Sequence, residues 1–203
     1  HLAVTHDGHR CHIYNGRHLR SVRRYQNKRK AQLSARLDRM KRGSRRWQRL
    51  RARKGETLRH LDNQVRDILH KQTTKLVSTL HQAGVQTVVI GDVRDIRHGL
   101  DYGAKANQKM HQWLHGKVRW MLSYKAEALG MGVAVQDEAY TSQTCPACGL
   151  RHKPNGREYH CNCGFSYHRD GVGAYNIRAK YLGSLGIPVV GVMASPTGVR
   201  YVL

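Results

Sequence analysis

Residues 139–177 read AYTSQTCPACGLRHKPNGREYHCNCGFSYHRDGVGAYNI, and this segment constrains the architecture more than any other. It holds two close cysteine pairs, Cys145 with Cys148 and Cys161 with Cys163, separated by twelve residues. A glycine follows each pair and eases the tight turn there. Four thiolates on two such turns fit a tetrahedral zinc ion, and a site closed by four sulfur ligands is structural. A pair of disulfides is the alternative, disfavoured because nothing in the sequence indicates export.

Apolar periodicity organises the chain on either side of this segment. Short apolar runs around Asp7 and Gly8 predict a β-hairpin over about 2–14. The spacing of leucines then predicts two long helices over about 17–83, with Ser44 as the N-cap of the second. Further on, we expect a buried strand at 85–90, a helix at about 107–129, a strand at 132–139, a short helix at about 170–182 and an irregular tail. This alternation predicts an α/β layer fold.

The composition indicates a polyanionic partner. The 203 residues include 36 Lys and Arg against 13 Asp and Glu, which gives a formal net charge of +23. A charge of this size opposes compaction unless a polyanion neutralises it, so nucleic acid is the expected partner. No apolar run is long enough for a membrane span and no signal peptide opens the chain, so we expect no membrane partner. Paired cysteines without signs of export indicate a reducing, cytoplasmic compartment, and Cys11 is expected to be a core thiol.

The positive charge is concentrated in one segment. Residues 17–54 contain seventeen Lys and Arg and a single acid, Asp38. Like charges at i,i+4 spacing destabilise an isolated helix, so phosphate contacts are the expected compensation, and arginine suits them best. The candidate nucleic-acid-binding residues are Arg23, Arg24, Lys28, Arg29, Lys30, Arg42, Arg45, Arg46 and Arg49.

The scarce acids follow expected strands or open an expected helix. Asp92 and Asp95 follow the strand at 85–90, Glu138 ends the next strand, and Asp170 opens a helix. Carboxylates gathered at the ends of strands can hold two divalent cations, Mg²⁺ or Mn²⁺, for phosphodiester hydrolysis. The alternative for Asp170 is an N-cap of its helix.

Residues 139–149, 161–165 and 168–177 together resemble the C-terminal signature of TnpB/OrfB proteins, insertion-sequence proteins described as transposases and related to type V CRISPR effectors. The resemblance implies an RNase H-like (RuvC-type) sheet with flanking helices, a long basic helical hairpin insertion and a zinc-ribbon insert. Its domains would be a nuclease core at 1–140 with the hairpin at about 17–83, a zinc ribbon at 141–167, and a final helix with a C-terminal tail at 168–203.

The same resemblance implies a function. It is that of an RNA-guided, divalent-metal-dependent DNA endonuclease of a transposable element, with DNA and a guide RNA as partners, acting in the prokaryotic cytoplasm at the nucleoid. Family members use three acids, of which Asp170 matches the third. The second is normally a Glu directly after the strand at 85–90, where this chain has Gly91. The first is an Asp in a G-x-D-x-G setting, which would lie upstream of His1.

Two interpretations follow for the catalytic centre. Glu138 ends the neighbouring strand, and its carboxylate would reach the same place because adjacent strands lie about 4.8 Å apart. The catalytic residues would then be Asp170 and Glu138. Alternatively, Asp92 points to the wrong face of its strand, and the protein is a nuclease-inactive DNA- or RNA-binding member of the family, a repressor or a remnant. An unrelated zinc-ribbon RNA-binding protein is a third possibility, which predicts no clustered acids.

Overall fold

The computed structural model describes residues 1–93, 103, 114–187 and 199–202. The chain divides into two compact units. The hairpin unit is Gly16–Thr79, and the strand unit combines His1–Asn15 with Leu80–Leu203. Within the described ranges, no helix is both long enough and apolar enough to cross a bilayer.

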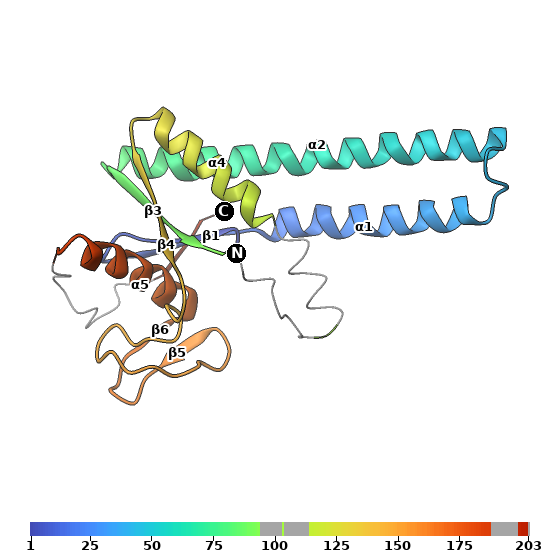
Figure 1. The fold of residues 1–203 in the computed structure, drawn as a ribbon. Helices are drawn as coiled ribbons and strands as arrows, with labels where there is room; N and C mark the ends of the chain where they lie inside the picture. Colours follow the sequence, from blue (N-terminus) through green and yellow to red (C-terminus); the bar gives the residue numbers. More distant parts are fainter. Residues whose placement is uncertain (94–102, 104–113, 188–198, 203) are drawn as a thin grey trace. The chain divides into compact units, whose positions relative to one another are not determined.

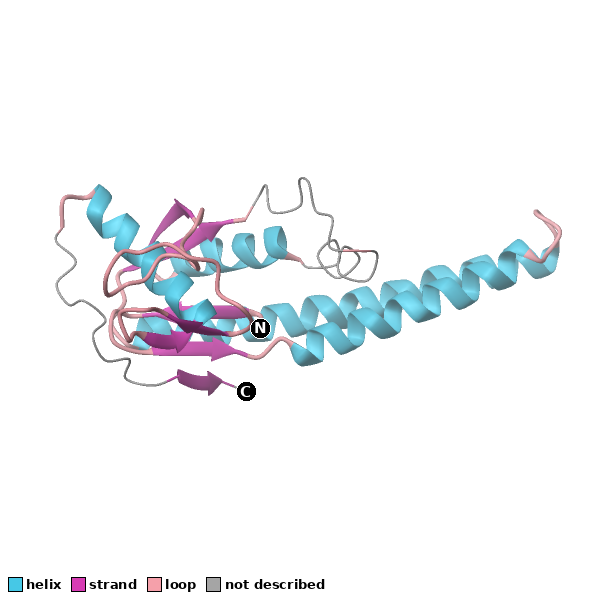
Figure 2. Cartoon of the chain, turned by 90° about the horizontal axis from the view of Figure 1, so that it is seen from below, coloured by secondary structure: helices cyan, strands magenta, loops and turns pink. Residues whose placement is uncertain are grey.

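The hairpin unit consists of two long helices that run side by side (Figures 1 and 2). They are α1 (Arg17–Asp38) and α2 (Arg45–Gln82), of which the part up to Thr79 belongs to this unit. The turn between them ends at Ser44, whose Oγ accepts a hydrogen bond from the Trp47 N–H at 3.2 Å, which confirms the predicted N-cap. Near this turn the helices share an apolar cluster of Leu33, Leu37 and Leu50, against which Met40 and Trp47 pack.

A polar clasp joins the same two helices further from the turn. Gln26 is buried, and its side-chain amide donates to Asp62 Oδ1 at 2.6 Å. Its carbonyl oxygen accepts from the Arg23 guanidinium at 2.7 Å. The sequence offered no signal for this contact, because the three residues are polar and 36 positions separate Gln26 from Asp62.

The strand unit begins with the predicted β-hairpin. Strand β1 (Ala3–His6) pairs antiparallel with β2 (Cys11–Tyr14), and the turn between them holds Gly8 at φ +111°. The Asp7 carboxylate closes the turn by accepting the N–H groups of His9 and Arg10, both at 2.7 Å.

The tail, which the sequence predicts to be irregular, contains a strand. Strand β7 (Val199–Val202) pairs parallel with β2 and completes a three-stranded sheet in the order β1-β2-β7. Its sequence, VRYV, is rich in β-branched and aromatic residues. It occupies the edge of β2, where unpaired backbone groups need partners.

A second sheet pairs β3 (Thr87–Asp92) with β4 (Gly132–Asp137) in parallel, and the register places Asp92 opposite Asp137. Helix α4 (His115–Ala128) precedes β4 and contacts it. The earlier part of the helix predicted at 107–129 lies outside the described residues, as does Asp95.

The last elements form around the cysteine segment. A small antiparallel ribbon of β5 (Glu158–His160) and β6 (Ser166–His168) leads into α5 (Arg169–Ser184). Helix α5 contacts strands of all three sheets and so organises this unit (Figure 1). The resemblance implies an RNase H-like sheet with flanking helices and a separate zinc-ribbon insert, and the described strands hydrogen-bond in three separate sets. The protein is thus a mixed α/β fold with a long helical hairpin.

Candidate functional site

The four paired cysteines come together on two turns of the strand unit. In the first turn, the Gly149 N–H donates to the Cys145 carbonyl at 2.9 Å. In the second, the Gly164 N–H donates to the Cys161 carbonyl at 3.0 Å. Both glycines adopt positive φ, +73° and +90°, which explains why glycine follows each pair.

The four sulfur atoms lie within 4.8 Å of one another. Cys145 Sγ is 3.7 Å from Cys163 Sγ, and Cys148 Sγ is 3.5 Å from Cys161 Sγ. A zinc ion bound by four sulfurs at about 2.3 Å sets them about 3.8 Å apart along each tetrahedral edge, so these spacings fit zinc. All five cysteines are free thiols, which excludes the disulfide alternative in this structure.

The thiols of this cluster differ in their electrostatics. Burial raises the pKa of Cys145 to about 12. A backbone hydrogen bond from Cys163 lowers the pKa of Cys161 to about 7. A structural metal ion bound by the four cysteines would supply positive charge. This charge would stabilise the thiolate form of the buried Cys145, which burial otherwise disfavours.

The cysteine cluster is built into the core of the strand unit. Cys145 shares a buried cluster with Tyr159, Phe165 and Tyr167, and that cluster continues to Cys11, Ile13, Val172 and Tyr175. Cys11 is fully buried, as predicted for a core thiol. Metal binding and the packing of α5 therefore depend on the same apolar residues.

Asn176 ties α5 to the segment that precedes the first cysteine pair. Its side-chain amide donates to the Thr141 carbonyl at 2.7 Å and to the Thr144 carbonyl at 2.8 Å. The sequence marked Asn176 only as part of the family signature. Its structural role depends on two hydrogen bonds between α5 and the loop at 141–144, which the sequence does not indicate.

Three acids lie at the carboxyl ends of β3 and β4. Asp92 forms an ion pair with Arg119 at 3.2 Å, and Asp137 forms one with Lys180 at 3.3 Å. Glu138 follows directly and is partly buried. Burial raises the pKa of the Glu138 carboxyl, and the nearby carboxylates of Asp137 and Asp92 raise it further.

The Glu138 carboxylate lies over Gly91. A Cβ placed on Gly91 would overlap Glu138 Oε2 and would approach Ile177 Cδ1 of α5 to 2.9 Å. The space that a side chain at position 91 would occupy is therefore filled by the Glu138 carboxylate. Glycine at 91 is a steric requirement of this arrangement.

Asp170 lies in the first turn of α5 with two histidines. One ligand atom of each of His1, His168 and Asp170 lies within 4.8 Å of the others, and His1 Nε2 is 3.8 Å from Asp170 Oδ2. His168, not Asp170, is the N-cap, because its Nδ1 accepts the Asp170 N–H at 3.3 Å. The Asp170 carboxylate is therefore not used as a cap. Among the described residues, Glu138 is not part of a ligand set with Asp170.

The candidate cations of the hairpin unit differ in exposure. Arg23 is partly buried in the clasp with Gln26, and Arg29 bonds to Gln32 at 3.1 Å. Arg23 therefore also helps to join the two helices, through its ion pair with Asp62 at 3.9 Å, whereas the Arg29 bond lies within α1. The remaining candidates are exposed: Arg24, Lys28, Lys30, Arg42, Arg45, Arg46 and Arg49.

Comparison with known proteins gives the chain a family. Residues 115–177 match the model of the Cas12f1-like TNB domain, and residues 1–97 match the OrfB_IS605 model, described as "Probable transposase". A TnpB-like protein of Methanocaldococcus jannaschii is 30% identical over 136 residues, which cover 64% of this chain and 49% of that protein. A Streptomyces pristinaespiralis protein named "Putative RNA-guided DNA endonuclease" is 37% identical over 120 residues, covering 57% of this chain and 28% of that one.

The chain thus spans about half the length of the first of these relatives. Among solved structures, the Cas12f1–sgRNA–target DNA complex aligns with a TM-score of 0.48 at 17% identity, over 64% of this chain and 39% of that one. The two family models match residues 1–97 and 115–177, and the TNB match contains the four clustered cysteines. The chain belongs to the TnpB/OrfB family of insertion-sequence proteins and carries a zinc-binding TNB domain of the Cas12f1-like kind.

Proposed function

We propose that this chain is the nuclease portion of an RNA-guided, divalent-metal-dependent DNA endonuclease of a transposable element. Its strand unit would be an RNase H-like (RuvC-type) core, and its hairpin unit would hold nucleic acid. The observation that carries the proposal is the position of the Glu138 carboxylate over Gly91, where family members have a catalytic Glu.

The electrostatics of Glu138 support a cation-binding role. A partly buried carboxylate beside two others is costly when ionised, and its raised pKa reflects that cost. No hydrogen bond or ion pair to Glu138's carboxylate is found among the described residues that would offset this cost. A divalent cation would offset it, as Mg²⁺ and Mn²⁺ prefer carboxylate oxygen.

Helix α5 connects Glu138 with the second proposed catalytic acid. Ile177 lies against the Gly91 position, and Asp170 is seven residues earlier, on the same face of the helix. Glu138 and Asp170 would each offer carboxylate oxygens to Mg²⁺ or Mn²⁺. Such ions, when bound, lower the pKa of an attacking water and stabilise the leaving oxygen of a phosphodiester.

Two observations favour the alternative, a nuclease-inactive DNA- or RNA-binding protein of the same family. Asp92 is already paired with Arg119, and Glu138 and Asp170 do not share one set of ligand atoms among the described residues. In that case the acids would only shape the strand ends, and the chain would act through its cations.

Relocating the carboxylate tests the proposal. The full-length protein and its Glu138→Ala, Gly91→Glu/Glu138→Ala and Glu127→Ala variants would be assayed for Mn²⁺-dependent cleavage of single-stranded DNA and for Mn²⁺ binding by calorimetry. Loss of a metal-binding carboxylate should lower cleavage by about 100-fold or more. The double variant should recover part of it, because its carboxylate starts from the position that Glu138 now covers.

Glu127 is exposed on α4, so its variant controls for the removal of an acid elsewhere. Cleavage and Mn²⁺ affinity that survive Glu138→Ala unchanged would contradict the assignment of Glu138. Absence of cleavage in the unaltered protein, together with tight nucleic-acid binding, would favour the inactive alternative.

A further inference from the structure

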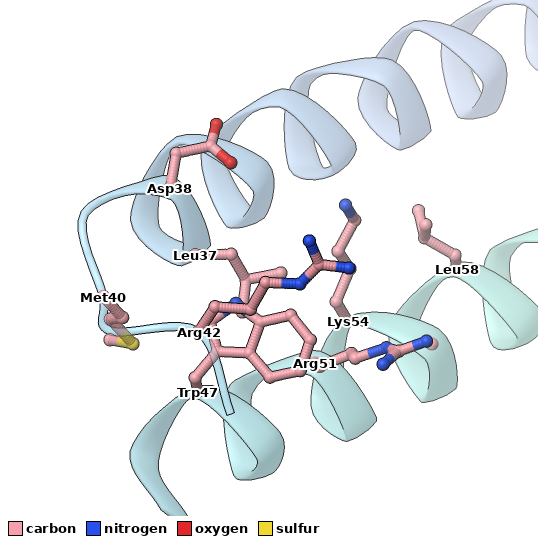
Figure 3. A pocket seen from close by; sticks show the side chains of 9 residues that line it. Leu37, Asp38, Met40, Arg42, Trp47, Arg51, Lys54 and Leu58 are labelled. Atoms are coloured by element: carbon pink, nitrogen blue, oxygen red, sulfur yellow. The ribbon is translucent and has the colours of Figure 1, made fainter. Parts of the chain in front are cut away.

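The hairpin unit contains an open pocket beside the turn that joins its two helices (Figure 3). Its volume is about 710 Å³, and all of its lining residues belong to this unit. We call it the hairpin-end pocket. It joins an aromatic ring, three cations and one acid, Asp38, which is the single acid of residues 17–54.

Trp47 offers the pocket an aromatic surface. Its indole packs on the leucine cluster of the turn and remains partly exposed. The Arg51 guanidinium lies over the ring, 5.1 Å from its centre. An indole with a neighbouring guanidinium is a surface on which nucleobases stack, by contact with the ring and with the arginine plane.

The cations of the pocket are available for a phosphate. Arg42, Arg51 and Lys54 line it, and none of them forms an ion pair in the described part of the chain. Lys54 is held in position by its hydrogen bond to Ser34 Oγ at 2.7 Å. Figure 3 shows Arg42 extending along the Trp47 ring and Arg51 beside the edge of that ring. Such a group of cations suits one phosphate and its neighbours.

Gly55 keeps the pocket open. It lies inside α2, where glycine is less favourable than almost any other residue. Its φ is not in the left-handed region, and nothing lies within 4 Å of a Cβ built on it, so neither backbone nor packing requires glycine. Since Gly55 lines the pocket, a larger side chain there would fill the space.

We propose that the hairpin-end pocket receives one unpaired nucleotide of a bound RNA. The base would stack against Trp47, and Arg42, Arg51 and Lys54 would hold the adjoining phosphates. Asp38 also lines the pocket, and it favours a ribonucleotide, because a carboxylate repels phosphate but accepts a hydrogen bond from a 2′-hydroxyl. The inference rests on the proposed nucleic-acid role of the hairpin unit, and it adds the site and the type of ligand.

Tryptophan fluorescence measures occupancy of this pocket directly. In a Trp113→Phe/Trp120→Phe background, Trp47 is the single reporter. Titration of the full chain with a short single-stranded oligouridine should quench its emission. Gly55→Leu should abolish the quenching and weaken binding by about tenfold, the contribution of one stacked base. Its melting temperature should not fall, because leucine favours a helix over glycine.

Two matched controls distinguish loss of the pocket from two general effects: removing a positive charge anywhere, and replacing any helical glycine with leucine. Gly116→Leu changes a helical glycine of α4 whose added Cβ would also have no described atom within 4 Å, and it should leave binding unchanged. Arg42→Ala should weaken quenching and affinity more than Arg46→Ala, an exposed arginine that does not line the pocket. Equal effects of the two arginine variants would overturn the proposal.

The remaining outcomes are also decisive. If Gly55→Leu leaves quenching and affinity unchanged, the hairpin-end pocket is not the nucleotide site. The proposed nucleic-acid role of the hairpin unit would then remain. No binding of oligouridine even at low salt would overturn both. An oligothymidine that binds and quenches as well as oligouridine would overturn the assignment of a ribonucleotide.

Discussion

At the scale of single residues, His6 shows how burial changes a titration. It lies on β1 with its ring edge-on to Tyr175, 5.2 Å between centres. Its Nδ1 accepts the Gly8 N–H at 3.0 Å, and its Nε2 is buried without a hydrogen-bond partner among the described residues. Burial lowers the pKa of His6 from 6.5 to about 4, against the opposing effect of Asp7. The folded protein therefore keeps this imidazole neutral where an unfolded chain would protonate it.

This shift predicts a loss of stability in acid. Above pH 6.5 the histidine is neutral in both states; as the pH falls towards about 4 only the unfolded chain takes up the proton. The free energy of unfolding should then decrease by about 2 kcal/mol from this residue. We expect His6→Phe to have a shallower decline of melting temperature between these pH values than the unaltered protein. His9→Phe, which changes an exposed histidine of the same turn, should follow the unaltered protein. Parallel curves for all three would show that His6 does not titrate as described.

Sequence patterns identify residues whose chemistry is local. The cysteine pairs could be predicted because each ligand pair and its glycine lie within five residues of one another. The overlap of Glu138 with the Gly91 position was only anticipated as one of two alternatives, since it depends on the register between β3 and β4. The two hydrogen bonds of Asn176 could not be predicted, because they join a helix to carbonyl groups of a loop about 35 residues earlier.

At the scale of elements, the β5–β6 ribbon depends on something other than its own strands. Each strand has three residues, too few for an isolated hairpin to be stable in water. The cysteine turns hold the ribbon at one end, and its buried rings, Tyr159 and Tyr167, share a cluster with Val172 of α5. A metal at the cysteines therefore stabilises both the ribbon and the helix that follows it.

Removal of zinc should disorder these elements. We expect Cys148→Ser/Cys163→Ser to lose the zinc ion and to lower the melting temperature by more than about 10 °C, at about 2–4 °C per kcal/mol in a chain of this size. Hydrogen exchange should accelerate at residues 141–177 and remain slow along α1. Cys11→Ala removes a buried thiol outside the metal cluster and should retain one zinc per chain. A double-serine variant that keeps its slow exchange would contradict a structural role for the metal.

Helices with a long periodic pattern were predicted well from the sequence. Strands whose position depends on pairing with a distant strand were predicted less well. The two hairpin helices follow a repeated leucine spacing. Helix α2 continues through Gly55, where the sequence pattern alone does not distinguish a continuous helix from a kinked one. Strand β7 was missed because four residues after a Pro- and Gly-containing segment give no clear alternation. Its pairing with β2 is a long-range contact that no local pattern encodes.

At the scale of the whole molecule, the charge is distributed unevenly along the chain. Residues 17–54 carry seventeen of the 36 cations and one of the thirteen acids, so most of the net charge of +23 lies in one segment. Most of the candidate phosphate-binding side chains there are exposed. In the proposed function, the hairpin unit would therefore provide most of the electrostatic contribution to nucleic-acid binding, and the strand unit would provide chemistry or positioning.

The salt dependence of binding tests this distribution. Each cation that neutralises a phosphate of a single strand contributes about 0.7 to the slope of log affinity against log salt concentration. Replacing Arg24, Lys28 and Lys30 with alanine should therefore lower that slope by about 2 for the oligouridine, measured by fluorescence anisotropy at several salt concentrations. The matched variant replaces Lys117, Lys153 and Arg157, three exposed cations of the strand unit, and should change the slope little. Both variants remove the same net charge, so an effect of overall charge would lower the two slopes equally. That result would contradict the hairpin unit as the main nucleic-acid interface, because only a local interface releases more counterions from one segment than from another.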